Sequence, residues 1–366
     1  MSRLFSPLHL GAVHLDNRIV ISPMCEYSAE DGRATDWHLI HLGSMALSGA
    51  GLLLLEATAV EPRGRITYAD LGLYDDATED ALGNVLRSVR KYSPMPIGIQ
   101  LSHAGRKAST ERPWDGGAPI LPGAPNGWQV VAPSALPYKE GQPVPAALSE
   151  SEIAALVTAF VSSAQRAHRI GLDAIEIHAA HGYLLHQFLS PLSNHRTDSY
   201  GGSLENRMRL TLQLFEAVRS AVPRSMAVGI RVSATDWVDG GWDLDQTIAL
   251  AKRLDAMGCE FIDVTSGGLS LAQKIPIGPG YHVPFAEAIK PVVQMPVISV
   301  GMITDAHQAE QIIATGRADA VALARSMLYD PRWPWHAAAA LGATAFAPPQ
   351  YLRCEPADKK GLFRRA

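Results

Sequence analysis

The chain has 366 residues, of which 47% are hydrophobic, so it can bury the core of one barrel-sized domain or of two smaller ones. Its formal net charge of −4 gives no reason to expect nucleic acid or an anionic membrane surface as a partner. Its three cysteines are far apart in sequence and form neither a metal-spaced cluster nor a disulfide framework, which favours a reducing compartment.

The N-terminal residues Met1–Pro7 lack the apolar segment and the cleavage pattern of a secretory signal. No run of about 18 apolar residues occurs anywhere in the chain. The sequence therefore predicts a cytoplasmic protein that does not enter a membrane.

Short apolar segments alternate with amphipathic segments along most of the chain. The predicted strands are Arg18–Ser22, Gly51–Glu56, Pro96–Leu101, Ala174–His178, Ala227–Ser233, Phe261–Ser266, Val297–Val300 and Ala320–Leu323. Most are almost continuously apolar, as expected for strands covered on both faces. The clearest helix follows the capping-box pattern Ser149–Glu152, continues at helical spacing through Ala164, and has Gly171 near its end.

Eight strands in alternation with about eight helices predict an α/β protein with a (β/α)₈ TIM barrel, formed by residues 1–366 as a single domain. A doubly wound sheet is the alternative, but Ser22–Cys25 stands where such a fold has its glycine-rich turn. Residues 103–148 are rich in proline and also contain Trp114 and Trp128. We expect them to be an insertion after the third strand that covers the barrel mouth.

Barrel enzymes carry their chemistry at the carboxyl ends of the strands, so these positions test the predicted fold. Candidate site residues occur after six of the strands, and one more lies within the fifth. They are Cys25 and Tyr27, Gln100 and His103, His178, His181 and Tyr183, Arg231, Ser266, Gly267 and Gly268, Gly301, and Ala324 and Arg325.

The fourth predicted strand leads directly into His178, His181 and Tyr183. Two neutral hydrogen-bond donors can hold a carbonyl oxygen and a phenol can give up a proton, which indicates a reduction site rather than a hydrolysis site. A satisfied core pair or a weak metal site is the alternative. A zinc-dependent hydrolase would add Glu176 from the same strand face, but it would need a further ligand and an acid or base poised on water.

The last three loops have the composition of a phosphate site. Loops after the seventh and eighth strands commonly bind phosphate in this fold. Gly267, Gly268 and Gly301 allow backbone N–H groups to approach an anion, and Arg325 can add a charged fork. Each glycine alone is also typical of an ordinary turn, but the three at one end of the barrel favour a phosphate site.

Several blocks of the chain, in this order and spacing, resemble the Old Yellow Enzyme family of FMN-dependent barrel ene-reductases. They are Asn17–Tyr27, Gln100–Lys107, His178–Tyr183, and Ser193–Ser203 with Asn206 and Arg207. The resemblance covers essentially the whole chain. It is closest to the thermophilic-like branch, which includes the bacterial xenobiotic reductases, because the other branch usually has threonine in place of Cys25.

The resemblance implies non-covalent FMN and either NADPH or NADH as the reductant. The substrates would be small molecules, namely α,β-unsaturated carbonyl or nitro compounds. Ser22, Pro23, Met24 and Cys25 would then line one side of the flavin, and Ala57 and Gln100 would bond its edge. Arg231 would lie near flavin N1, where a fixed cation raises the reduction potential; an ion pair inside the barrel is the alternative.

The resemblance also implies how the phosphate end is held. The implied residues are Ser266, Gly267, Gly268, Gly301, Ala324 and Arg325. The family usually has glycine where this chain has Ala324, and alanine can serve there if its φ is negative. Glu26 stands where relatives often have a neutral residue, so we expect its side chain to face away from the flavin.

For the reaction, the resemblance implies that His178 and His181 bind the substrate carbonyl oxygen and that Tyr183 protonates the α-carbon. Tyr27 and Lys107 would contact the substrate as well. A flavin-binding or electron-transfer module without catalysis is an alternative, and it would not require Tyr183.

The tail formed by residues 345–366 carries Arg353. In similar enzymes an arginine here reaches into the active site of a neighbouring subunit, which implies a homodimer or homotetramer. A frayed basic tail is the alternative. His38 and His41 have the i, i+3 spacing of a helix face, but no third ligand accompanies them, so we expect a structural role and no metal.

Overall fold

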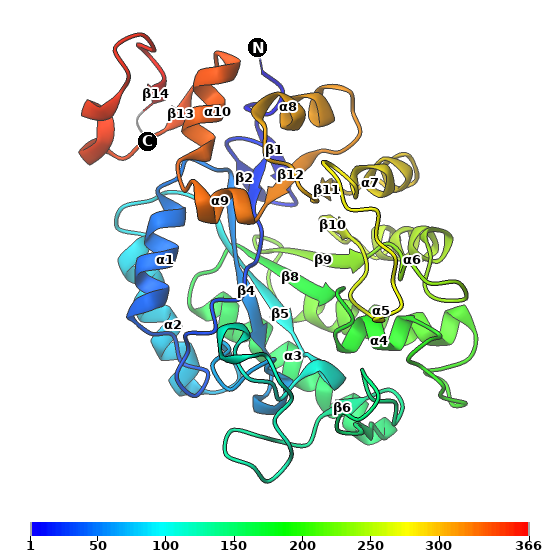
Figure 1. The fold of residues 1–366 in the computed structure, drawn as a ribbon. Helices are drawn as coiled ribbons and strands as arrows, with labels where there is room; N and C mark the ends of the chain where they lie inside the picture. Colours follow the sequence, from blue (N-terminus) through cyan, green and yellow to red (C-terminus); the bar gives the residue numbers. More distant parts are fainter. Residues whose placement is uncertain (1, 365–366) are drawn as a thin grey trace.

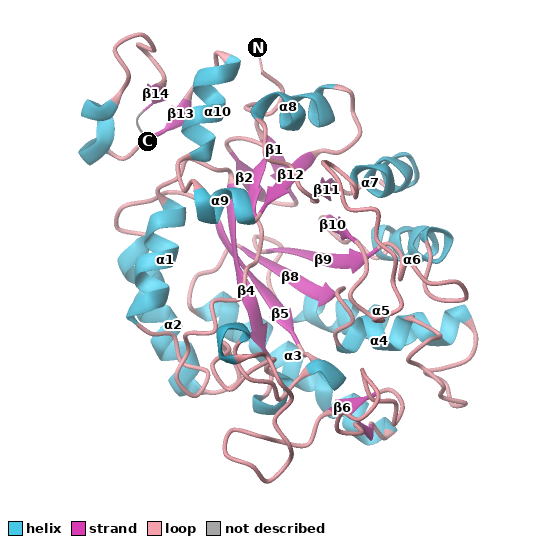
Figure 2. Cartoon of the chain, in the orientation of Figure 1, coloured by secondary structure: helices cyan, strands magenta, loops and turns pink. Residues whose placement is uncertain are grey.

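The computed structural model describes residues 2–364 and contains a closed barrel of eight parallel strands (Figures 1 and 2). In barrel order the strands are β3 (Ile19–Ile21), β4 (Leu52–Ala59), β5 (Ile97–Ser102), β8 (Ala174–Ala179), β9 (Ala227–Ser233), β10 (Ile262–Thr265), β11 (Val297–Ser299) and β12 (Ala320–Leu323). All eight predicted strands and the TIM-barrel fold are confirmed. Most ends differ from the prediction by one residue, but β4 continues three residues further and therefore includes Ala57.

Helices surround the barrel, as Figure 2 shows. They are α1 (Asp36–Ala46), α2 (Asp76–Val89), α3 (Glu150–Arg169), α4 (Leu184–Leu189), α5 (Leu204–Ala221), α6 (Leu244–Ala256), α7 (Val283–Ile289), α8 (Ala306–Ala314), α9 (Arg325–Tyr329) and α10 (Trp333–Leu341). The predicted capping box of α3 is confirmed, because Glu152 N–H donates to Ser149 Oγ (3.3 Å) and Ser149 N–H donates to Glu152 Oε2 (2.9 Å). None of the described helices is both long and apolar enough to cross a membrane.

A short antiparallel hairpin, β1 (Leu8–Leu10) and β2 (Val13–Leu15), precedes the barrel and was not predicted. Its apolar side chains belong to one buried cluster with barrel residues such as Val20 and Phe261. The hairpin therefore closes the amino-terminal end of the barrel. Strands of three residues are too short to show a period in the sequence.

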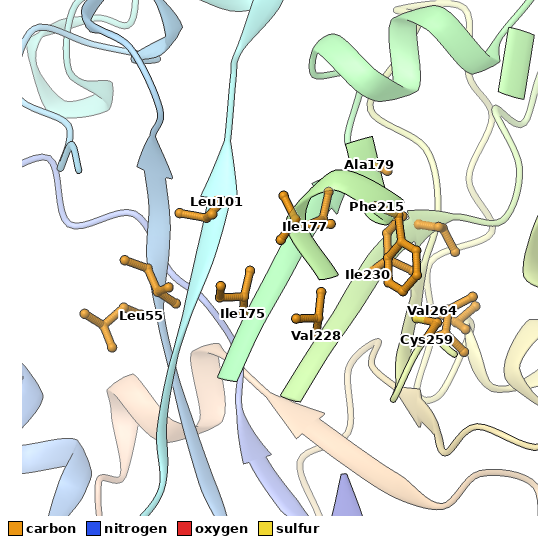
Figure 3. Packing of buried hydrophobic residues seen from close by; sticks show 14 of the residues in the cluster. Leu55, Leu101, Ile175, Ile177, Ala179, Phe215, Val228, Ile230, Cys259 and Val264 are labelled. Carbon is orange, nitrogen blue, oxygen red and sulfur yellow. The ribbon is translucent and has the colours of Figure 1, made fainter. Parts of the chain in front are cut away.

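Side chains alternate along each strand, which separates the core from the site. Ile175 and Ile177 of β8 pack in the apolar layer beneath the helices with Val228 and Ile230 of β9 (Figure 3). The residues between and after them, Glu176 and His178, point to the other face, which is the barrel interior. The spacing that builds the core thus also directs polar side chains inward.

The predicted insertion contains the short helices η2 (Gly105–Lys107) and η3 (Pro113–Asp115) and the strand pair β6 (Val131–Ala132) and β7 (Ala146–Ala147). Arg106 donates to Leu269 O (3.1 Å), and Lys107 donates to His181 O (2.9 Å) and Gly268 O (3.0 Å). These bonds fasten the start of the insertion to the loops that follow β8 and β10.

The predicted tail lies beside α10 (Figure 1). It forms β13 (Ala345–Phe346), the short helix η5 (Pro349–Cys354) and β14 (Phe363–Arg364), and its last residues, 365–366, lie outside the described part of the chain. Trp335 of α10 anchors it by donating from Nε1 to Phe346 O (2.8 Å).

Candidate active site

His178 and His181 meet at the carboxyl end of β8. His178 is the penultimate residue of the strand and is buried. The chain then turns, and His181 adopts a left-handed φ of +58° while its N–H donates to Ser233 Oγ (2.9 Å). His181 Nδ1 lies 3.3 Å from His178 Nε2, so the two imidazoles are within hydrogen-bond distance of each other.

Both imidazoles are neutral. Burial lowers the pKa of His178 and of His181 well below the usual value, and the charge of Arg231 lowers both further. Ala180 N–H donates to His178 Nδ1 (3.2 Å), so the proton of the neutral His178 ring is on Nε2. His181 Nε2 lies 3.2 Å from Thr265 Oγ1. The pair can therefore donate hydrogen bonds without carrying a charge.

Tyr183 completes the group predicted from the sequence. It precedes α4, and its ring meets the His178 ring edge-on at a centroid distance of 5.0 Å. Burial raises the pKa of the Tyr183 phenol well above its usual value, so the phenol keeps its proton at neutral pH. The structure thus brings two neutral donors and one neutral acid together on one turn.

Lys107 lies next to this turn. Its Nζ is 5.1 Å from the centre of the Tyr183 ring, and its ammonium bonds two backbone carbonyls in the neighbouring loops. Burial, and then the charge of Arg106, lowers the pKa of Lys107 to about 8. A cation therefore stands beside the acid at neutral pH.

A buried His–Asp pair lies behind the turn, and sequence reasoning missed it. His186 Nδ1 accepts from Gly182 N–H (2.9 Å), and His186 Nε2 lies 2.8 Å from Asp236 Oδ1. Burial opposes the charge of Asp236, but the nearby His186 outweighs it and lowers the pKa of that carboxyl. The two residues are 50 positions apart, so nothing local in the sequence indicates the pair.

The residues predicted to line the flavin come from the first three barrel strands. Ala57 and Gln100 are register partners on β4 and β5, so these two lie side by side as expected. Ser22 is buried, and its Oγ has no hydrogen-bond partner among residues 2–364, which leaves it available to a bound group. Burial raises the pKa of the Cys25 thiol, so it is a neutral side chain rather than a thiolate.

The floor of the site is an ionic cluster. Arg231 Nε lies 3.2 Å from Asp263 Oδ2, so the ion pair that we considered as the alternative for Arg231 is present. Gln100 Nε2 donates to Glu176 Oε1 (2.6 Å). Burial, and then the charge of Asp263, raises the pKa of Glu176 to about 8. The Gln100 amide thus holds the Glu176 carboxyl in place. Asp263, which faces Arg231, was not predicted from the sequence.

The predicted phosphate residues separate into two groups. Gly301, Ala324 and Arg325 line one cavity of about 660 Å³. Ser266, Gly267 and Gly268 do not line it. Gly268 lies beside the histidine turn, where a Cβ would approach the His181 backbone to 2.6 Å, and Ser266 Oγ accepts from Trp237 Nε1 (2.8 Å). Ala324 has a φ of −111°, which satisfies the condition for alanine at this position.

His282 was not predicted, and it also lines this cavity. Its two ring nitrogens have no partner within the described chain. Burial, and then the charge of Arg231, lowers the pKa of His282 to about 3. A neutral, unpartnered imidazole, the unpartnered Ser22 Oγ and a glycine-lined hollow fit a large polar cofactor such as FMN.

The remaining predicted residues belong to other segments of the chain. Glu26 faces α1, because Trp37 Nε1 donates to its carboxylate (2.9 Å); that it faces away from the flavin stays a prediction. His38 has a structural contact, since its Nδ1 accepts from Thr35 N–H at the start of α1 (2.9 Å). Tyr27 packs edge-on against Trp114 of the insertion. Arg353 is exposed on η5, without a side-chain partner in residues 2–364.

Three similarities to known proteins bear on this geometry. Residues 3–343 match the family described as NADH:flavin oxidoreductase / NADH oxidase. The chain is 45% identical over 355 residues to an NADPH dehydrogenase of Listeria innocua, covering 96% of this chain and 99% of that protein. It is 43% identical over 332 residues to an NADH:flavin oxidoreductase of Gibberella zeae, covering 86% and 80%.

Among solved structures, morphinone reductase in complex with tetrahydroNAD has a TM-score of 0.76 and 29% identity, with 99% of this chain and 94% of that chain covered. The similarities span the barrel and the site together. They favour neither the zinc-dependent hydrolase nor the flavin module without catalysis.

Proposed function

The chain belongs to the NADH:flavin oxidoreductase / NADH oxidase family and is an FMN-dependent oxidoreductase of the Old Yellow Enzyme type, and we propose that it is an ene-reductase. Its substrates would be small α,β-unsaturated carbonyl or nitro compounds. FMN, held by the residues named below, would supply the hydride chemistry between NADPH or NADH and the substrate β-carbon. The residues of the chain then have to hold the substrate and deliver a proton.

The neutral pair His178 and His181 is the observation that carries the proposal. In the reduction, negative charge develops on the substrate carbonyl oxygen, and donors aimed at that oxygen become stronger as the charge grows. One such donor is worth roughly 3 kcal/mol. Because burial keeps both rings neutral, they donate without attracting an anion in the resting enzyme. The same donors can hold the carboxamide of the nicotinamide during the first half-reaction.

Tyr183 supplies the proton to the α-carbon. Its raised pKa keeps the phenol protonated until the substrate becomes basic, and its contact with the His178 ring directs it to the bound carbonyl compound. Positioned acids of this kind contribute roughly 10²- to 10⁴-fold to a rate. Tyr27 and Lys107 complete the proposed substrate contacts, and Arg353 of a neighbouring subunit would add one more.

The cofactor would lie across the barrel mouth between two groups of residues. We propose that the flavin ring contacts Ser22, Pro23, Met24, Cys25, Ala57, Gln100 and Arg231, and that the phosphate end contacts Ser266, Gly267, Gly268, Gly301, Ala324 and Arg325. The unpartnered Ser22 Oγ supports the placement of the ring, and the hollow lined by Gly301, Ala324 and Arg325 supports the placement of the phosphate end. For Ser266, Gly267 and Gly268, which are not part of that hollow, the placement rests on the family resemblance alone. The proposed single domain spans residues 1–366, with residues 103–148 as its cap.

The visible spectrum of the purified protein, recorded during anaerobic addition of NADPH and then of cyclohexenone, tests the proposal. Bound flavin should bleach with NADPH and recover its absorbance with the enone. Flavin that is reduced but not reoxidised by enones or nitroalkenes would contradict the ene-reductase assignment while leaving the family intact.

A further inference from the structure

A second large cavity lies beside the proposed active site. Its volume is about 910 Å³, within the range of ligand-binding pockets. The loops after β3 and β4 and part of the insertion form it. The lining residues that matter here are Arg33, Arg63, Arg65, Tyr68, Arg112 and Trp128. Tyr27 borders the same cavity and follows Cys25 by two residues, so the cavity begins where the proposed flavin site ends.

Four arginines in one cavity suggest an anionic ligand, but three of them already face a carboxylate. The pairs are Arg33–Asp31 (3.4 Å), Arg63–Glu61 (2.7 Å) and Arg112–Asp115 (2.6 Å). Glu30 and Asp31 lie at the Arg33 side of the lining. Arg65 is the one arginine of the four that has no carboxylate partner within residues 2–364, so its charge is the one that no ion pair neutralises.

The guanidinium of Arg65 is held in place. Its Nε donates to Pro62 O (3.0 Å) and its Nη1 donates to Tyr68 O (3.2 Å). Its Cζ lies 5.4 Å from the centre of the Trp128 ring, and Trp128 Nε1 is itself fixed by Arg63 O (2.9 Å). These contacts leave Nη2 without a bond and fix the orientation of the fork. A pre-oriented guanidinium is the side chain best suited to phosphate.

The family requires a nicotinamide nucleotide, and this chain has no Rossmann motif to hold the adenosine half of it. We propose that this cavity binds the adenosine 2′-phosphate end of NADPH, with Arg65 as the residue that distinguishes NADPH from NADH. The nicotinamide end would lie at His178 and His181. The inference rests on the proposed function in one respect, since it needs a nicotinamide reductant at those histidines.

The test compares Arg65→Gln with the wild-type holoenzyme in anaerobic flavin reduction, with NADPH and NADH titrated separately. The variant should need about 10- to 100-fold more NADPH for half-saturation, the size expected for a lost charge-assisted hydrogen bond. Its NADH requirement should change by less than about threefold. Arg253→Gln, at an exposed position of α6 outside the cavity, is the matched control and should leave both values unchanged.

A binding measurement separates this site from the chemistry. Calorimetric titration of the oxidised holoenzyme with 2′,5′-ADP and with 5′-AMP should show tighter binding of 2′,5′-ADP, by about tenfold or more, and Arg65→Gln should abolish that preference. Arg65→Lys keeps the charge and should retain part of it, which guards against a folding defect in the glutamine variant. Equal binding of the two nucleotides, or an unchanged preference in Arg65→Gln, would overturn the inference.

Reoxidation of dithionite-reduced enzyme by cyclohexenone serves as the independent check, because that half-reaction contains no nicotinamide nucleotide. Normal reoxidation together with no 2′,5′-ADP preference overturns the NADPH site and leaves the proposed function standing. No reoxidation together with a clear 2′,5′-ADP preference overturns the proposed ene-reductase function and leaves the NADPH site standing.

Discussion

The reactive residues depend on staying uncharged in a site that contains Arg231 and Lys107. Burial accomplishes this, since it disfavours the charged form of His178, His181 and Tyr183 alike. The local cations act in the same direction on the histidines, because a positive neighbour opposes a second positive charge. The site therefore stabilises a negative charge that develops on a bound oxygen, while His178 and His181 themselves stay neutral.

Replacing Tyr183 by phenylalanine tests the assignment of the acid. The variant keeps the ring that packs against His178 and loses only the hydroxyl. We expect the rate of enone reoxidation to fall by roughly 10²-fold or more, while flavin reduction by NADPH changes by less than about threefold. Stopped-flow absorbance measures both half-reactions on one sample. An equal loss in the two would mean general damage to the site rather than loss of an acid.

Lys107 predicts a pH dependence near pH 8 that His178, His181 and Tyr183 cannot produce, although Glu176 in the floor of the site also has a pKa of about 8. Its pKa of about 8 means that the ammonium loses its charge as the pH rises through 8. The lowered histidine pKa values and the raised tyrosine pKa place those titrations below about 6.5 and above about 10. The reoxidation rate should therefore fall about fivefold across pH 8, since the charge is worth about 1 kcal/mol to the developing oxyanion.

Lys107→Met supplies the control for this titration. It keeps an apolar stem of similar length and removes the charge, so the fivefold drop that Lys107 contributes should be lost, and any remaining change near pH 8 would belong to Glu176. A drop across pH 8 that persists in the methionine variant would have to be assigned to another group.

Neighbouring residues in the sequence were the easiest to predict. His178, His181 and Tyr183 act from one turn, so a single stretch of sequence displayed them together. Asp236, Asp263 and His282 lie in loops or strands far along the chain from the residues that they influence. No local pattern distinguishes them from ordinary polar residues, and only the closed barrel brings them to the site.

At the level of elements, the strands were predicted because they are buried on both faces and therefore apolar throughout. The loops after them carry the strain. Non-glycine residues with left-handed backbone follow β3, β8, β9 and β11, and they are Tyr27, His181, Trp237 and Met302. Such residues cost energy and persist where the surroundings fix them, often at functional sites. Their conformations depend on tertiary contacts and were not predictable from local sequence.

Gly301→Ala tests the loop after β11. Gly301 has a φ of +114°, and a Cβ there would lie 2.9 Å from His282 Nδ1, so alanine should distort the wall of the 660 Å³ cavity. We expect FMN affinity to fall about tenfold or more, from strain of roughly 1–3 kcal/mol. Fluorescence of released FMN during dilution gives the dissociation constant.

Gly316→Ala is the matched control for that loop. It has a φ of +74°, and a Cβ would meet no heavy atom within 4 Å. Gly316 follows α8, outside the cavity lining. The substitution should reduce stability by about 1 kcal/mol and leave FMN affinity unchanged. Equal losses of FMN affinity in the two variants would mean that the hollow beside Gly301 does not hold the cofactor.

The whole molecule has a surface that suits contact with a second copy. Trp37 and Ile40 of α1 are 47% and 66% exposed, and Tyr351 of η5 is 41% exposed. Arg332, just before α10, donates to Ser44 O (3.0 Å) in α1 and lies over the Tyr351 ring, so α1 and the tail are held near one another. An isologous contact over these segments would place both tails at one interface.

Mixed assemblies of two variants can test whether Arg353 acts in the neighbouring subunit. A Tyr183→Phe subunit has an impaired site and an intact tail, whereas an Arg353→Ala subunit has an intact site and an impaired tail. Arg353→Ala alone should weaken enone binding, by about tenfold for a lost charge-assisted bond. In a mixed dimer, the intact site would face the intact tail, so half of the sites should show both the wild-type reoxidation rate and the wild-type enone affinity, a combination that neither parent variant has. Two different affinity tags, one on each variant, and purification over both in succession isolate the mixed species. A mixture that behaves as the average of its two parents would place Arg353 outside the neighbouring site and return the tail to a structural role.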